Sequence, residues 1–208
     1  GFANTISPDA WEPFKQNLSK SLKSLKQAEK LNSKDPAIYS KWVYVAMGLG
    51  ERDEMETAFQ KGVAIEPTFY PLYANYGFAH LPKWYGEPGQ YEKIAVRSAD
   101  STKDKIGDSL YYLFALDMTR QVHDVNEFKD TGFDYNRIKQ GQKDFAKQFP
   151  NSMDTEASNR LCFMACAAGD KEFARDCFLD IGDKWNEKVW RNSETFEKYK
   201  TWARNKDN

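Results

Sequence analysis

The chain contains few of the side chains that most enzymes use for catalysis or metal binding. Only two of its 208 residues are histidine, His80 and His123, and only three are cysteine. No Ser/His/Asp or Cys/His catalytic set can be assembled from so few histidines, and no His/Cys spacing matches a zinc site. We therefore expect no catalytic residues, no metal, no cofactor and no enzymatic activity.

An excess of charge of one sign is also missing. The 30 basic and 31 acidic side chains leave a formal net charge of −1, so no overall field favours nucleic acid as a partner. No apolar run approaches the roughly 20 residues that a membrane-spanning helix needs. The chain begins with Gly1 rather than Met, so either the initiator Met or a longer N-terminal segment was removed, or Gly1 is the remnant of a tag. An export signal would explain such a removal, which favours a periplasmic or exported protein over a cytoplasmic one.

Aromatic residues, by contrast, are abundant. They make up 15% of the chain and include six Trp, eleven Tyr and fourteen Phe. So much aromatic surface argues against disorder despite 29% charged residues. Cys162 and Cys166 lie four residues apart on one expected helix, where disulfide geometry is unfavourable. Two buried, small apolar side chains are therefore favoured over a redox or metal-binding pair.

Apolar residues recur with helical spacing from the start of the chain. A first stripe runs from Trp11 to Leu25 in steps of three and four, which predicts an amphipathic helix over residues 8–31. Six lysines lie roughly 120° from this stripe at about 100° per residue: Lys15, Lys20, Lys23, Lys26, Lys30 and Lys34. A solvated face is the favoured interpretation, and contact with an anionic partner is the alternative.

The most informative pattern is a repeat with a period of 34 residues. Four positions recur at the same internal spacing: Tyr39, Trp42, Val43 and Ala46 are followed by Tyr73, Tyr76, Gly77 and His80. The first copy continues with Met55-x3-Phe59 and Pro67, and the glycine-containing turn at 48–53 separates two expected helices. A later copy reads Ser158-x2-Leu161-Cys162-x2-Ala165, followed by Ala174-x3-Phe178.

These motifs resemble the tetratricopeptide-repeat (TPR) superfamily, whose 34-residue helix–turn–helix unit carries Trp-x2-Leu-Gly-x2-Tyr, Ala-x3-Phe and Pro. The resemblance implies an all-α fold of about nine or ten helices, stacked as antiparallel hairpins in a TPR-like superhelix. Two further segments, 81–86 and 149–152, resemble uncharacterised bacterial proteins in which a Leu-Pro-Arg-Trp-Gly-Gly-like stretch interrupts such repeats. That likeness implies a bacterial source and an unassigned role.

We expect a single domain over residues 1–208. Its expected parts are an N-terminal helix (8–35), a first repeat (36–69), a second repeat (70–104) with a loop insertion at 81–89, an irregular pair (105–152), a fourth repeat (153–183) and a capping segment (184–208). In the irregular pair, a buried helix is expected over 108–122 and a polar loop over 124–132.

The resemblance also implies a concave groove that binds an unknown protein or peptide. Groove positions lie one and five residues after the first signature aromatic of each repeat, which gives Ser40, Tyr44, Ala74, Phe78, Asn159 and Phe163. Members that bind a C-terminal carboxylate place Lys and Asn at such positions, and only Asn159 fits. An apolar or aromatic peptide is therefore the expected ligand.

The loop insertion supplies a second candidate site, formed by Lys83, Trp84 and Tyr85. Aromatic and cationic side chains on a turn are typical of a binding hot spot, although Trp84 could instead fold back onto the insertion. The leading hypothesis is a non-catalytic protein-interaction scaffold. The alternatives are a hydrolase acting on a glycan or peptide near His80 and Glu87, and a structural component of a cell-envelope assembly.

Overall fold

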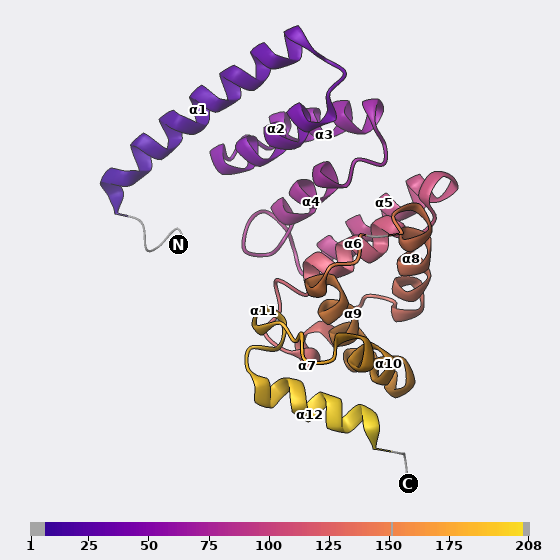
Figure 1. Cartoon of the computed structure of the whole chain (residues 1–208). Helices are drawn as coiled ribbons and strands as arrows, with labels where there is room; N and C mark the ends of the chain where they lie inside the picture. The colour runs from indigo at the N-terminus through magenta and orange to yellow at the C-terminus, as the bar shows by residue number, and fades with distance from the viewer. Residues whose placement is uncertain (1–6, 151, 206–208) are drawn as a thin grey trace. The chain divides into compact units, whose positions relative to one another are not determined.

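A computed structural model describes residues 7–150 and 152–205, and the only regular secondary structure in these ranges is α-helix. The all-α fold expected from the sequence is confirmed, and the way the helices pack is compatible with stacked hairpins (Figure 1). In the same ranges, no helix is both long enough and apolar enough to cross a membrane.

Contacts within the chain divide it into two compact units. Unit 1 comprises residues 1–91 and unit 2 comprises residues 92–208, so the boundary falls in the first turn of α5 (Gln90–Ile106). The single domain expected over the whole chain stays a prediction.

Unit 1 is built around helix α2. Its helices are α1 (Pro8–Leu31), α2 (Pro36–Leu49), α3 (Arg52–Ile65) and α4 (Tyr70–Ala79). Helix α2 contacts the other three, and its apolar side chains form the core: Tyr39, Trp42, Val43, Ala46 and Met47 are all buried. Asp35 caps α2, because its side chain accepts a hydrogen bond from the Ala37 N–H.

The 34-residue repeat has a direct structural counterpart in unit 1. The Tyr39 hydroxyl donates to the Ser33 carbonyl at 3.0 Å, and the Tyr73 hydroxyl donates to the Pro67 carbonyl at 2.7 Å. In both cases the acceptor lies six residues before the tyrosine. The two tyrosines therefore fix the entry into their helices in the same way.

The described part of unit 2 contains two helical hairpins, two short helices and a last helix of 12 residues. Its helices after α5 are α6 (Ser109–Met118), α7 (Val125–Lys129), α8 (Tyr135–Gln148), α9 (Thr155–Ala168), α10 (Lys171–Ile181), α11 (Glu187–Trp190) and α12 (Ser193–Arg204). Helix α6 packs on α8, and α9 packs on α10. Helices α7 and α11 also lie against α9, and α12 packs on α10.

Helices α2 and α9 end in the same way, as their shared sequence pattern predicts. Each has 14 residues and is followed by a glycine in the left-handed conformation, Gly50 with φ 79° and Gly169 with φ 74°. A side chain other than glycine would strain the backbone at these positions. The next N–H, of Glu51 or Asp170, bonds back to the carbonyl of Ala46 or Ala165.

The described residues form twelve helices rather than the nine or ten expected. One addition is α7, inside the segment 124–132 that the sequence predicts as a polar loop. The Asp124 side chain caps this helix, and Val125 and Phe128 form its buried apolar face. Five residues are too few for this face to show a helical period in the sequence. The last helix is capped by Asn192 rather than by Ser193, because the Asn192 side chain accepts from the Thr195 N–H.

Candidate functional site

The segment after α4 closes into a tight turn held by backbone hydrogen bonds. The Tyr85 N–H donates to the Ala79 carbonyl at 3.1 Å, and the N–H groups of Trp84 and Gly86 both donate to Leu81. Three bonds within the eight residues from Ala79 to Gly86 leave the turn little freedom. The loop insertion is therefore a preorganised element on unit 1.

Gly86 is needed for this turn because of a close backbone approach. A Cβ atom at Gly86 would lie 1.8 Å from the His80 carbonyl oxygen. That distance is far below van der Waals contact, and the obstacle is backbone rather than a mobile side chain. Any larger residue would force the turn open.

Tyr85 anchors the turn to the rest of unit 1. Its hydroxyl donates a hydrogen bond to the Met47 carbonyl at the end of α2. The Arg52 guanidinium lies over its ring, with Cζ 4.6 Å from the ring centre. Tyr85 therefore links the turn to α2 through its hydroxyl group and to Arg52 of α3 through its ring.

Trp84 is 44% exposed, and its ring centre lies 6.5 Å from that of Tyr85. Its ring centre lies 6.0 Å from that of Phe78, and the Lys83 ammonium group lies 4.7 Å from the Phe78 ring centre. Burial lowers the pKa of Lys83. More than half of the Trp84 side chain is therefore covered by its neighbours, and the remainder is open to solvent.

Tyr44 adds a second exposed aromatic ring on the neighbouring helix. The Ser40 hydroxyl donates to the Pro71 carbonyl at 2.9 Å, and the Asn75 amide donates to the Ser40 carbonyl at 3.0 Å, so these contacts set the register of α2 against α4. One turn further along the two helices come Tyr44, which is 51% exposed, and Phe78, which is half-buried. We call Tyr44, Phe78, Lys83 and Trp84 the aromatic face.

Other expected groove positions are not at the surface. Ser40, Asn159 and Phe163 are 3%, 0% and 4% exposed, whereas Ala74 is half-buried. Ser40 is buried because it joins α2 to α4. Asn159 and Phe163 are buried because the short helices α7 and α11 cover this side of α9.

Asn159 is a structural centre of unit 2. Its amide nitrogen donates to the carbonyls of Thr155 and Lys184, at 2.8 and 3.0 Å. Its amide oxygen accepts from the Asn186 N–H and from Trp190 Nε1, at 3.1 and 2.8 Å. All hydrogen-bonding positions of this amide are used within the fold. Asn159 therefore has no free donor for a C-terminal carboxylate, the ligand that such an Asn binds in members of the TPR superfamily.

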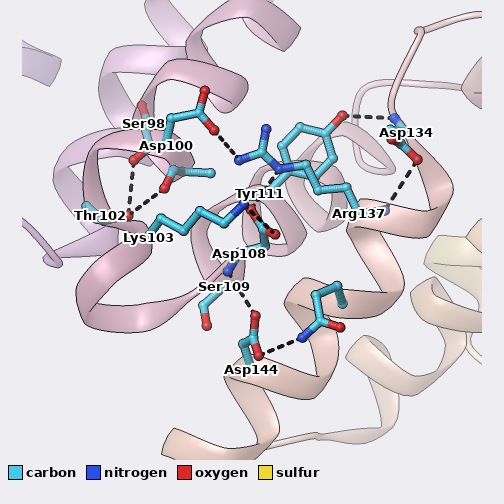
Figure 2. A network of polar contacts seen from close by, with 12 residues as sticks. Ser98, Asp100, Thr102, Lys103, Asp108, Ser109, Tyr111, Asp134, Arg137 and Asp144 are labelled. Atoms are coloured by element: carbon cyan, nitrogen blue, oxygen red, sulfur yellow. Dashed lines mark hydrogen bonds and ion pairs between the residues drawn. The ribbon is translucent and has the colours of Figure 1, made fainter.

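A polar network that the sequence does not predict joins α5, α6 and α8 in unit 2 (Figure 2). Arg137 donates to Asp108 at 2.7 Å and to Asp100 at 2.6 Å. Its guanidinium also lies 4.6 Å from the Tyr111 ring centre. The Tyr111 hydroxyl in turn accepts a hydrogen bond from the N–H of Asp134, the residue just before α8.

The members of this network bind one another, which indicates a structural role. Asp108 is buried, accepts from Arg137 and lies 3.9 Å from Lys103, while its N–H donates to Asp144 at 3.0 Å. A buried carboxylate is stable only when it is paired in this way. We therefore assign the network to the packing of α8 against α6.

The structure also locates His80, Glu87 and the cysteine pair singled out by sequence. The His80 ring nitrogen Nδ1 lies 2.8 Å from the Tyr76 carbonyl, and Glu87 is exposed. Cys162 and Cys166 are buried, and burial raises the pKa of the Cys162 thiol far above its usual range. Within residues 7–150 and 152–205, no three His, Cys, Asp or Glu side chains are grouped so that they could hold a metal ion. The hydrolase hypothesis gains no observation and stays a prediction.

In comparisons with protein-family models, curated proteins and solved structures, nothing matches the chain. Function is therefore argued from the surface of the molecule. The aromatic face is the feature that brings the most sequence-predicted site residues together.

Proposed function

We propose that this chain is a TPR-like helical-repeat protein that binds an apolar or aromatic segment of another protein on its aromatic face. The observation that carries the proposal is the exposure of Trp84 on a turn fixed by hydrogen bonds. Matching tyrosine contacts in α2 and α4 and matching glycine ends of α2 and α9 support the repeat character.

The energy available from Trp84 alone is substantial. A tryptophan buries up to about 250 Å², so its exposed 44% corresponds to roughly 110 Å². At about 25 cal/mol per Å², covering this area contributes about 2–3 kcal/mol to binding. Because the turn is already ordered, little of this gain is lost to fixing the loop.

Tyr44 and Phe78 extend the same surface along α2 and α4. Tyrosine and tryptophan are enriched in binding hot spots because they offer large, rigid and amphipathic contact area. Tyr44 keeps half of its surface in solvent even though its neighbours Val43 and Ala46 are buried. We infer that an extended peptide with two apolar side chains contacts Tyr44 with one of them and Trp84 with the other.

A selection from a displayed library of random peptides tests this proposal. We expect the wild-type chain to enrich a motif with aromatic or large aliphatic residues, and the Trp84→Ala variant to bind the enriched peptide at least tenfold more weakly. Phe149→Ala is the matched control, since it removes an aromatic ring that is 52% exposed in unit 2. Circular dichroism checks that both variants fold.

The two variants separate the possible outcomes. Equal binding by wild type and by the folded Trp84→Ala variant would place the partner elsewhere. Equal weakening by Phe149→Ala would show that the selected peptides respond to general stickiness rather than to the aromatic face. Failure to enrich any motif would argue against a peptide ligand.

A further inference from the structure

A hollow of about 340 Å³ opens along the lysine-rich side of α1 in unit 1. Helix α1 contributes six lining residues: Ser19, Leu22, Lys23, Lys26, Gln27 and Lys30. Glu51, at the turn between α2 and α3, lines it as well. Ser19, Lys23, Lys26 and Lys30 recur in steps of four, three and four, so they lie along one side of the helix.

Positive charge is concentrated here, although the whole chain carries −1. Residues 15–34 contain six lysines and a single acidic residue, Glu29. Glu29 is already paired, because Lys61 binds it at 2.7 Å and holds its pKa below the usual range. The surplus of ammonium groups on this side of α1 is therefore not offset by its own acid.

The lysines of the hollow differ in how they are held. The Lys26 ammonium group is fixed by Glu54 at 2.7 Å and lies 5.3 Å from the centre of the Trp42 ring. Lys23 and Lys30 are exposed, and in the described part of the chain neither forms an ion pair. They are seven residues apart, which places them two turns, or about 10 Å, from each other along α1.

We propose that this hollow binds a small compound with two or more phosphate groups. Two lysines that lie about 10 Å apart along the helix axis can contact charges spread over more than one phosphate, whereas a single ion offers only one charge centre. Ser19 and Gln27 line the same hollow and can donate hydrogen bonds to phosphate oxygens. The site is separate from the aromatic face and does not depend on the peptide-binding proposal.

Glu51 provides a specific test, because it is the acidic residue among the seven that line the hollow. A carboxylate at this position repels a bound phosphate, whereas it would favour a cationic ligand. Removing its charge should therefore strengthen phosphate binding. A general attraction of anions to the lysine-rich helix gives no such specific dependence on one residue.

Isothermal titration calorimetry with tripolyphosphate, at low ionic strength, tests the assignment. We expect Lys23→Gln combined with Lys30→Gln to weaken binding about tenfold or more, and Glu51→Gln to strengthen it about threefold, from the Coulomb energy of partly exposed charges. The control is Lys15→Gln combined with Lys34→Gln, which removes the same charge outside the hollow and should change affinity less than twofold.

Three results would overturn the proposal. The first is no measurable heat with the wild-type chain. The second is equal weakening by the two double variants, which would show only a diffuse attraction to α1. The third is cosedimentation with vesicles of an acidic phospholipid when tripolyphosphate does not bind, which would identify a membrane surface as the anionic partner.

Discussion

Replacing Asn159 by alanine should destabilise unit 2 more than most single substitutions do. The side chain is fully buried and makes four hydrogen bonds, which connect α9 to the segment around α11. Its removal leaves three partners without a bond in a buried environment: the Lys184 carbonyl, the Asn186 N–H and the Trp190 indole N–H. Thr155 keeps its helical bond and is less affected.

The size of the effect follows from these unpaired groups. A buried donor or acceptor without a partner costs about 1–3 kcal/mol, so three groups at the lower part of this range lower the free energy of unfolding by about 3–5 kcal/mol. Domains of this size are stabilised by about 5–15 kcal/mol. The variant should therefore unfold at clearly lower urea concentration and open first around α9 and α11.

Urea unfolding combined with hydrogen exchange of backbone amides measures this effect. Exchange resolves α9 and α11 separately from unit 1, which matters because two compact units need not unfold in one transition. Asn136→Ala on α8 is the matched control, because Asn136 is exposed and its loss should change stability by less than about 0.5 kcal/mol. A loss below about 1 kcal/mol in Asn159→Ala, or weaker peptide binding at unchanged stability, would refute the structural assignment.

Two further predictions concern pH and the loop. The hydrogen bond from Arg120, joined by one from Arg160, holds the pKa of Glu156 below its ordinary value of 4.5. Such a group stabilises the fold above its unfolded pKa and loses this contribution as the pH falls through the folded value, so thermal stability should fall below about pH 4.5, and less steeply in Glu156→Gln. Gly86→Ala should lower the free energy of unfolding by about 1–3 kcal/mol and expose Trp84 further to a fluorescence quencher, whereas Pro82→Ala, at an exposed position of the same turn, should do neither. Unchanged quenching in Gly86→Ala would argue against the closed turn.

Local pattern was sufficient for the longer helices. The sequence predicts α1 from its apolar stripe, and it predicts the helix pairs α2–α3 and α9–α10, in which a glycine ends the first helix. These signals come from residues within one or two turns of each other, where periodicity and capping determine structure. The spacing of Tyr39 and Tyr73 even anticipates a shared hydrogen-bond geometry. Helices α7 and α11 were not predicted, because their five and four residues are too few to show a helical period.

The capping residues were the one local signal for these short helices. Asp124 and Asn186 each accept hydrogen bonds from the first turn that follows, and both residue types favour this position. The Arg137 network had no local signal of any kind. Its contacts to Asp108 and Asp100 span 29 and 37 residues, so only the folded chain brings them together.

The burial of Asn159 and Phe163 limits where a partner can bind. Groove positions transferred by repeat spacing assume that the neighbouring helix pair leaves one side of α9 open. Here the ring of Phe163 lies 6.2 Å from Phe128 of α7 and 5.8 Å from Trp190 of α11, measured between ring centres, so two short helices occupy that side. A peptide could reach it only by displacing Trp190, which is fully buried. Of the expected groove positions, only Tyr44, Ala74 and Phe78 of unit 1 keep part of their surface in solvent.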